Sequence, residues 1–367
     1  MLFRSPNGLR AISDYGRAKD VKTLVWFEPE RVTSPSWLYD NRPQWLLKPS
    51  NLPPALGYQA AWRLLNLGNP EARQWLTDHI DGLLKSQGID FYRQDFNMDP
   101  LYFWQANDAE DRQGITEIKY VMGYLAYWDE LKRRNPNLRI DSCASGGRRL
   151  DLETMRRAVS LTRDDYLFEP VGEQGHFYGI SSWLPFAGSG FNDRRSMLTS
   201  KIASASWLPA DGSRQIESDS YLFRSIMGLN VTAGIDVQDK QVDFSTIRKL
   251  YTQWHKIAPD YYGDFYPLTP YSLDQTQWMA WQMNRPDTGE GMVQAFRRYA
   301  SVYESAQFKL RGLDSSALYE VTDMDTGKAT RETGNDLMTR GIVISLPDQP
   351  AAALVRYQKF NSVASSR

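Results

Sequence analysis

The hydrophobic pattern switches from helical spacing to a continuous apolar run at one point in the first third of the chain. Apolar residues recur at helical spacing before Gly88, at Leu76, Ile80, Leu83 and Leu84. A proline at residue 70 and a glycine at residue 88 are typical of the two ends of a helix. The sequence GIDFYRQDFNMDP follows at once, at residues 88–100. This pattern predicts a helix that leads directly into a buried strand.

The same succession recurs along the chain. Helices are expected at residues 9–19, 70–88, 115–135 and 152–158. Strands are expected at residues 21–27, 88–100, 138–142, 159–162, 178–190 and 229–237. The repeated strand, loop and helix predicts an α/β fold with a (β/α)8 TIM-type barrel. Fewer than eight such units can be counted, so we expect the barrel to lack its first strands.

The pattern changes near Pro267. Short runs with alternating or branched apolar residues follow, at residues 308–310, 317–322, 341–346 and 353–357. Turns separate these runs, which is typical of a small antiparallel β-sandwich. We therefore predict a partial barrel at residues 1–266, a C-terminal β-sandwich at residues 267–360 and a tail at residues 361–367.

Composition excludes several classes of function. The 43 basic and 44 acidic residues nearly cancel, and no long run of one sign is present, so neither nucleic acid nor a membrane surface is an expected partner. With one cysteine, Cys143, and three scattered histidines, no metal site or other cofactor is expected. No signal-peptide pattern opens the chain, which makes a cytoplasmic location the default expectation. Aromatic residues make up 13%, and their flat faces suit sugar rings.

Acidic residues follow two of the expected strands. Asp95 ends the run at residues 88–100, and Asp165 follows the strand at residues 159–162. Parallel α/β folds bind ligands at the carboxyl ends of their strands, so a barrel could bring both carboxylates to one point. A glycosidase uses such a pair, about 5–5.5 Å apart for retention and roughly 6.5–9.5 Å apart for inversion. An isolated aspartate would more often cap a loop; the second carboxylate favours catalysis.

Neighbouring residues fit this interpretation. Arg93 lies on the same face of the strand as Asp95, and its positive charge would keep that carboxylate ionised. The acid partner must hold its proton, which a negative charge on Asp164 would favour for Asp165. The glycines of the sequence CASGGRR, at residues 143–149, permit a close backbone approach to a ligand.

Several motifs in a fixed order resemble the barrel of glycoside hydrolase family 36, the melibiase-type α-galactosidases. They are PNGLRAISDYGRAKDVKTLVWFEPERV, NLGNPEARQWL, GIDFYRQDFN, SCASGGRRLD and RDDY, and the resemblance runs from about residue 7 to residue 357. It implies a retaining mechanism on a (β/α)8 barrel followed by a C-terminal β-sandwich. Members normally also carry an N-terminal β-sandwich and two earlier barrel strands, which we do not find here.

The resemblance implies a role for each site residue. Asp95 corresponds to the nucleophile of the K-W-D-M-N motif, and Asp165 to the acid/base when counted from the cysteine motif. The substrate-binding residues are expected to be Trp26, Arg93, Asn97, Cys143, Gly146 and Arg163. Arg149 and Asp151 are expected to support the loop that they belong to.

Three positions depart from the family pattern. Arg93 and Gln94 replace a lysine and a tryptophan, and Asp164 stands where a serine is usual. These departures indicate a divergent branch of the family. The resemblance therefore supports the retaining mechanism more strongly than it supports specificity for galactose.

The sequence thus predicts a retaining α-glycosidase of α-galactosidase type that hydrolyses terminal α-galactosides by double displacement. Two alternatives keep the chemistry, an α-N-acetylgalactosaminidase and an α-galactosyl transglycosylase. A third, of another class, is an inactive carbohydrate-binding fragment. An oligosaccharide or glycoside is the expected ligand in each case, and assembly into a homo-oligomer is left open.

Overall fold

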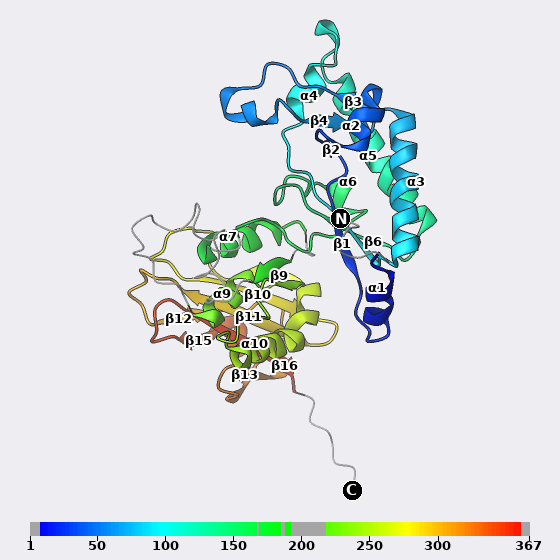
Figure 1. Cartoon of the computed structure of the whole chain (residues 1–367). Coiled ribbons are helices and arrows are strands. Elements are labelled where there is room, and N and C mark those ends of the chain that lie inside the picture. Colours follow the sequence, from blue (N-terminus) through cyan, green and yellow to red (C-terminus); the bar gives the residue numbers. More distant parts are fainter. Residues whose placement is uncertain (1–7, 167–168, 185–187, 192–217, 361–367) are drawn as a thin grey trace. The chain divides into compact units, whose positions relative to one another are not determined.

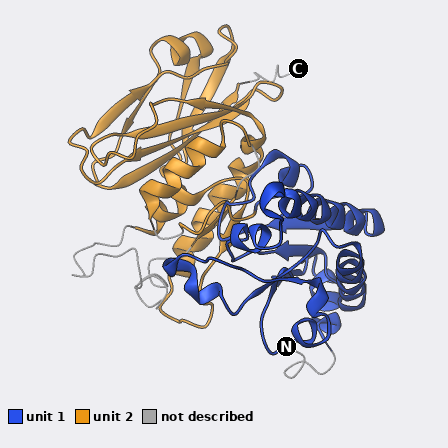
Figure 2. Cartoon of the chain, turned by 90° about the horizontal axis from the view of Figure 1, so that it is seen from above, with its two compact units in different colours: residues 1–160 blue, residues 161–367 orange. Residues whose placement is uncertain are grey.

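The computed structural model describes residues 8–166, 169–184, 188–191 and 218–360. The chain forms two compact units, residues 1–160 and 161–367 (Figure 2). The boundary predicted between residues 266 and 267 falls within β9 (Asp264–Pro267), and it stays a prediction. The predicted tail at residues 361–367 lies outside the described part of the chain. Within the described ranges, no helix combines the length and the apolar character needed to cross a membrane.

A parallel three-stranded sheet forms the centre of the first unit. Its strands are β1 (Leu24–Phe27), β5 (Phe91–Gln94) and β6 (Arg139–Ser142), in the order β1-β5-β6. The register places Arg93 of β5 between Trp26 and Asp141 of its two neighbours. Because the strands are parallel, their carboxyl ends meet at one edge of the sheet, where Asp95 follows β5.

Two long helices, α3 (Pro70–Gln87) and α5 (Ile115–Arg134), pack against one another in this unit (Figure 1). The side chain of Asn69 caps α3, and Gly88 ends it in the left-handed conformation with φ 66°. These ends confirm the predicted helix. The unit also contains α1 (Arg10–Arg17), α4 (Leu101–Gln105) and α6 (Leu152–Met155).

The buried face of α5 is aromatic. Its buried residues are Tyr120, Gly123, Tyr124, Tyr127, Trp128 and Leu131. Of the apolar residues whose spacing predicts this helix, Ile115, Ile118 and Met122 are exposed, whereas Trp128 is buried.

A long segment between β1 and α3 contains a small antiparallel sheet in the order β2-β4-β3. Its strands are β2 (Arg31–Val32), β3 (Leu46–Leu47) and β4 (Arg63–Leu65), and α2 (Trp37–Asn41) lies between the first two. Short 3-10 turns cover Pro43–Trp45, Pro54–Gln59 and Glu110–Arg112.

The second unit begins with helices and a short parallel pair of strands. These elements are α7 (Pro170–Ile180), β7 (Ser189–Phe191), α9 (Asp219–Ile226), β8 (Val231–Ala233) and α10 (Phe244–Ile257), followed by a 3-10 turn (Ala258–Tyr262). Helix α7 corrects the strand expected at residues 178–190: it occupies the start of that range, and among the described residues of the range only those of β7 form a strand. The strand expected at residues 159–162 is reduced to isolated bridges at Val159 and Ser160, of which Val159 pairs with Asp141.

A six-stranded antiparallel sheet follows, in the order β14-β13-β16-β11-β10-β9. Besides β9 it contains β10 (Met279–Arg285), β11 (Glu290–Arg297), β13 (Leu318–Asp323), β14 (Ala329–Thr333) and β16 (Ala351–Lys359). A two-stranded sheet pairs β12 (Ser305–Phe308) with β15 (Ile342–Ser345), and α11 (Gly334–Thr339) precedes β15. The hairpin of β10 and β11 was not predicted from the sequence.

The two faces of the six-stranded sheet belong to different cores. Met279, Trp281 and Met283 of β10 pack with residues of α7, α9 and α10. Trp278 and Ala280 pack with Phe308 of β12 and residues of β15. This alternation follows from the two-residue period of a strand, and it makes the sheet the middle layer of the second unit.

Candidate active site

Asp95 lies at the carboxyl edge of the parallel sheet, where its carboxylate accepts three hydrogen bonds and its backbone makes a fourth. Its own backbone N–H donates to the carbonyl of Phe27 at the end of β1, over 2.8 Å. The indole N–H of Trp26 donates to Oδ2 over 3.1 Å, and the backbone N–H of Phe96 donates to Oδ1 over 2.7 Å. A longer contact of 3.4 Å joins the backbone N–H of Ser145 to the same Oδ1.

These hydrogen bonds keep Asp95 ionised. The residue is only 8% exposed, and burial alone would raise the pKa of its carboxyl group. Hydrogen bonds with Asn97, Trp26, the Phe96 backbone and Cys143 outweigh burial, so the pKa is lowered from its ordinary value. An ionised, partly desolvated carboxylate suits the role of a nucleophile.

Trp26 offers an exposed aromatic surface beside this carboxylate. Its side chain is 47% exposed, although its N–H is engaged by Asp95. A flat apolar ring next to a charged group can contact the C–H face of a sugar while the carboxylate approaches the ring atoms.

The ion pair of Arg93 is with Asp141, its neighbour in the register, rather than with Asp95. Asp141 is completely buried. Burial alone would lower the pKa of Arg93. The adjacent negative charges, that of Asp141 first, outweigh this effect, so the pKa is raised. Hydrogen bonds are the main causes that lower the pKa of Asp95, and the charge of Arg93, whose pKa Asp95 raises in turn, acts beside them.

The loop after β6 folds back over the end of β5. The backbone N–H of Cys143 donates to the carbonyl of Gln94 over 2.8 Å. Ser145 and Gly146 take positive φ angles of 47° and 82°, which turn the loop toward Asp95. The Ser145 hydroxyl donates to the side-chain oxygen of Asn97 over 2.8 Å.

This loop brings several predicted residues together and adds one. Cys143 is 4% exposed, and burial raises the pKa of its thiol to about 12, so it stays protonated beside Asp95. Asn97 and Cys143 thus lie at the carboxylate together with Trp26, and the backbone of Gly146 adjoins the thiol of Cys143. Ser145 was not named from the sequence, where only its place among small residues marked it.

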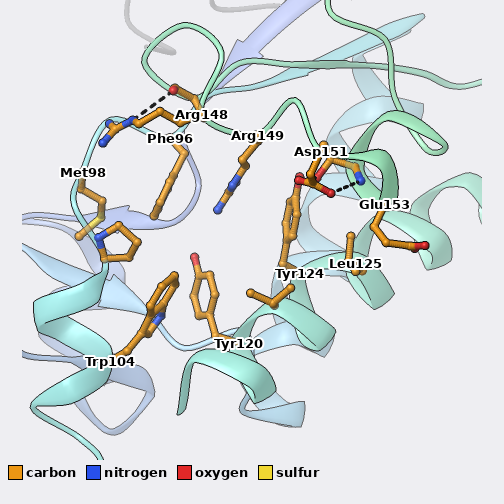
Figure 3. A pocket seen from close by; sticks show the side chains of 14 residues that line it. Phe96, Met98, Trp104, Tyr120, Tyr124, Leu125, Arg148, Arg149, Asp151 and Glu153 are labelled. Carbon is orange, nitrogen blue, oxygen red and sulfur yellow. Dashed lines mark hydrogen bonds between the residues drawn. The ribbon is translucent and has the colours of Figure 1, made fainter. Parts of the chain in front are cut away.

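A pocket of about 480 Å³ lies behind the same loops (Figure 3). Phe96 and Ala144, the chain neighbours of Asp95 and Cys143, line it together with aromatic residues of α4 and α5. Asp95 is not among the described residues that line it. The pocket therefore adjoins the back of the site rather than the carboxylate.

Asp165 lies in the second unit and is exposed. Its neighbour Asp164 accepts a hydrogen bond from the backbone N–H of Tyr166 over 2.8 Å and lies 2.8 Å from Nδ1 of His176. Burial opposes ionisation of Asp164, but the His176 hydrogen bond and the charge of Arg163 lower its pKa. A negative charge thus stands next to Asp165, as the sequence argument required for the acid partner.

Arg163 is 2% exposed and bonded inside the second unit. It donates to Glu173 over 2.6 Å and to the carbonyl of Ile226 over 3.3 Å. Burial raises the pKa of Glu173 to about 8 despite the charge of Arg163. The guanidinium of Arg163 thus supports the segment that carries Asp165. Glu173 and His176 were missed from the sequence because they lie on α7, which was not predicted as a helix.

Two family models match the chain. The family described as Melibiase matches residues 3–185, and the glycosyl hydrolase family 36 C-terminal domain matches residues 278–364. Alpha-galactosidase Mel36A of Lactobacillus acidophilus is 25% identical over 324 residues, which cover 87% of this chain and 42% of the relative. Alpha-galactosidase AgaA of Geobacillus stearothermophilus is 23% identical, over 92% of this chain and 44% of the relative. The chain thus spans less than half the length of these relatives.

Solved structures show the same fold. The alpha-galactosidase from Lactobacillus brevis has a TM-score of 0.80 at 20% identity, over 98% of this chain and 47% of that chain. A variant of AgaA from Geobacillus stearothermophilus in complex with raffinose has a TM-score of 0.78 at 21% identity, and the match covers 97% of this chain and 47% of that chain. This likeness confirms the predicted fold class, a TIM-barrel-type parallel sheet followed by an antiparallel β-sandwich.

Proposed function

Because the chain belongs to the melibiase family of glycoside hydrolases, family 36, we propose that it hydrolyses terminal α-galactosides with retention at the anomeric carbon. One observation carries this proposal. Asp95 is a buried, ionised carboxylate at the carboxyl end of a parallel strand, with the exposed ring of Trp26 hydrogen-bonded to it. The relatives that this chain matches are alpha-galactosidases by name.

Double displacement assigns one step to each aspartate. Asp95 attacks the anomeric carbon and forms a covalent glycosyl ester, while Asp165 gives its proton to the departing aglycone oxygen. Asp165 then removes a proton from water, and the oxygen of that water displaces Asp95 from the anomeric carbon. The sugar leaves with its original configuration, Asp165 regains its proton, and Asp95 is again a carboxylate. Retention requires the two carboxyl groups to lie about 5–5.5 Å apart.

Other residues of the site are assigned to substrate binding. Trp26 would contact one face of the galactose ring, and Arg93 and Asn97 would bind its hydroxyls. Cys143 and Gly146 would adjoin the 2-substituent. The buried thiol of Cys143 and the close packing of its loop on Asp95 support a preference for a hydroxyl over the larger acetamide at this position. Galactose is therefore proposed in preference to N-acetylgalactosamine.

Hydrolysis of two aryl glycosides tests the proposal. We expect turnover of the aryl α-galactoside well above that of the aryl α-N-acetylgalactosaminide. Asp95→Asn should lower kcat by at least about 10³-fold, because the amide cannot act as the nucleophile. Asp99→Asn is the matched control, since Asp99 bonds Arg148 and Gln59 and not the proposed nucleophile.

The first product seen by NMR should be the α-anomer of galactose. A β-anomer formed first would exclude double displacement. Galactose binding with no turnover in the unaltered chain, unchanged by Asp95→Asn, would instead favour the carbohydrate-binding alternative. Galactosyl transfer to an added sugar acceptor in preference to water would identify a transglycosylase.

A further inference from the structure

Glu30 is a completely buried carboxylate with four hydrogen-bond donors around it. It follows β1 and accepts from Gln94 Nε2 over 2.6 Å and from the hydroxyl of Tyr120. Arg149 forms a two-point pair with it, Nη1 to Oε1 over 2.7 Å and Nη2 to Oε2 over 2.8 Å. The donors come from β5, α5 and the loop after β6, so a single side chain joins three separate segments.

We propose that Glu30 is a positioning residue, which fixes the nucleophile Asp95 and the Ser145 loop relative to each other. This inference rests on the proposed function for the role of Asp95. Glu30 acts through two intermediaries, Gln94 and Arg149, and bonds to neither Asp95 nor Ser145 itself.

The first connection runs through Gln94, which directly precedes Asp95. Its Nε2 donates to Glu30, and its Oε1 accepts from the Tyr92 hydroxyl over 2.8 Å and from the Trp128 indole over 2.7 Å. An amide held at both ends has one orientation only. The end of β5 is therefore fixed by side-chain bonds in addition to its strand pairing.

The second connection runs through Arg149. Figure 3 shows its guanidinium between the rings of Phe96 and Tyr124. The central carbon of the guanidinium lies 4.1 Å from the centre of the Phe96 ring and 4.2 Å from that of Tyr124. Burial lowers the pKa of Arg149, but the charge of Glu30 raises it by more, so the guanidinium stays charged. A two-point pair between planar groups fixes orientation as well as distance. It thereby sets the position of the loop that places the Ser145 N–H near Asp95.

A purely structural role is the alternative. Buried ion pairs often stabilise a fold no better than apolar residues of the same shape, so stability alone is a weak reason for this one. The two interpretations differ in one respect. Positioning requires that loss of the pair loosens the loop by local opening, and not only through global unfolding.

Cys143 reports on this opening without any substrate. It is the sole cysteine of the chain, it belongs to the same loop, and it is buried. Its rate of labelling by a thiol reagent under native conditions therefore measures exposure of the loop. Glu30→Gln keeps the size of the side chain and removes the charge that holds Arg149. We expect labelling of Cys143 at least about tenfold faster, with kcat at least about tenfold lower and a smaller change in KM.

Asp108→Ala is the matched control. Asp108 accepts hydrogen bonds from the backbone N–H groups of Gly114 and Thr116, at the start of the helix that carries Tyr120. Its loss destabilises the same unit without removing a bond of Glu30. Labelling of Cys143 in this variant should follow its global unfolding, measured by urea denaturation. Arg149→Lys replaces Glu30→Gln if the latter does not fold, because an ammonium keeps the charge but not the two-point geometry.

The outcomes separate the two interpretations. Fast labelling in Glu30→Gln or Arg149→Lys, beyond what their unfolding free energies explain, supports positioning. Labelling that tracks global unfolding equally in these variants and in Asp108→Ala would overturn it. Absence of galactoside turnover in the unaltered chain would contradict the proposed function, while the labelling rates would still decide whether Glu30 fixes the loop.

Discussion

The indole of Trp26 contributes both to the proposed sugar-binding surface and to the ionisation of Asp95. The ring of Trp26 is exposed enough to contact a sugar, and its N–H holds the carboxylate of Asp95. The bond helps to lower the Asp95 pKa against the opposing effect of burial. Substrate binding and ionisation of the nucleophile should therefore respond to changes at the same residue.

Trp26→Phe separates these two contributions, because phenylalanine keeps a flat ring but has no N–H to donate to Asp95. The pKa of Asp95 should rise. Since the nucleophile acts when ionised, activity is lost as the pH falls through this pKa, and the acidic limb of the kcat/KM profile should move to higher pH. At neutral pH we expect kcat/KM to fall by about tenfold or more.

The exposed Trp37 of α2, which stacks on Trp75, provides the control. Trp37→Phe should leave the profile unchanged. An acidic limb that stays in place in Trp26→Phe would mean that the indole bond does not tune Asp95.

For single residues, the sequence predicted where a functional side chain lies better than which side chain it pairs with. Asp95 was found because a charged residue follows an apolar run. Arg93 was assigned to Asp95, which is close in sequence, whereas its partner is Asp141, 48 residues further on. That pairing depends on the register of two parallel strands, which no local pattern encodes.

Helix α5 shows how a helix can be predicted correctly although its packing face is only partly indicated by the apolar spacing. Of the residues at that spacing, Ile115, Ile118 and Met122 are exposed, whereas Trp128 is buried. The packing face is formed by tyrosines and a tryptophan, whose hydroxyl and indole groups make buried hydrogen bonds such as those of Tyr120 and Trp128. Aromatic residues with a polar group count weakly in a hydrophobic pattern, although they bury a large area.

Gly123 on this packing face should resist substitution. An added Cβ would lie 2.0 Å from the carbonyl oxygen of Leu67, a backbone atom that cannot move aside by itself. Gly123→Ala should therefore lower the free energy of unfolding by about 1–3 kcal/mol, although alanine favours a helix by about 1 kcal/mol. Urea denaturation measures this change.

Gly82 in α3 is the matched control, because nothing lies within 4 Å of its added Cβ. Gly82→Ala should stabilise the protein by about 0.5–1 kcal/mol, since only helix propensity changes there. Equal effects of the two substitutions would show that the close approach of α5 to Leu67 is relaxed in solution.

At the scale of the whole molecule, the sandwich strands at residues 317–322 and 353–357 were predicted because their apolar residues alternate. The hairpin of β10 and β11 was missed because almost all of its residues are buried, polar ones included. Gln282, for example, donates to the Tyr357 hydroxyl over 2.7 Å and to the Arg311 carbonyl over 2.9 Å. In a sequence, a polar residue that is hydrogen-bonded inside a core cannot be told from a polar residue on the surface.

The same hairpin determines where the C-terminal part can be separated. One face of the six-stranded sheet packs on helices that precede residue 267, through Met279, Trp281, Met283, Met292, Phe296 and Leu354. An isolated fragment of residues 267–360 would expose this face, which is too apolar to remain solvated as a monomer. We expect the fragment to aggregate or to bind a hydrophobic dye strongly, and a fragment of residues 161–367, which keeps α7, α9 and α10, to do so much less.

Size-exclusion chromatography and dye fluorescence at equal concentration compare the two fragments. The contact of Arg224 on α9 with Asp325 of the β13–β14 turn, over 2.5 and 2.8 Å, adds a second reason for the longer fragment. Without α9 the carboxylate of Asp325 loses its partner, and without the turn a guanidinium that is almost fully buried loses its counter-charge. A monomeric fragment of residues 267–360 that does not bind the dye would instead support the sequence-based boundary at residue 267, with the helices as a separable layer.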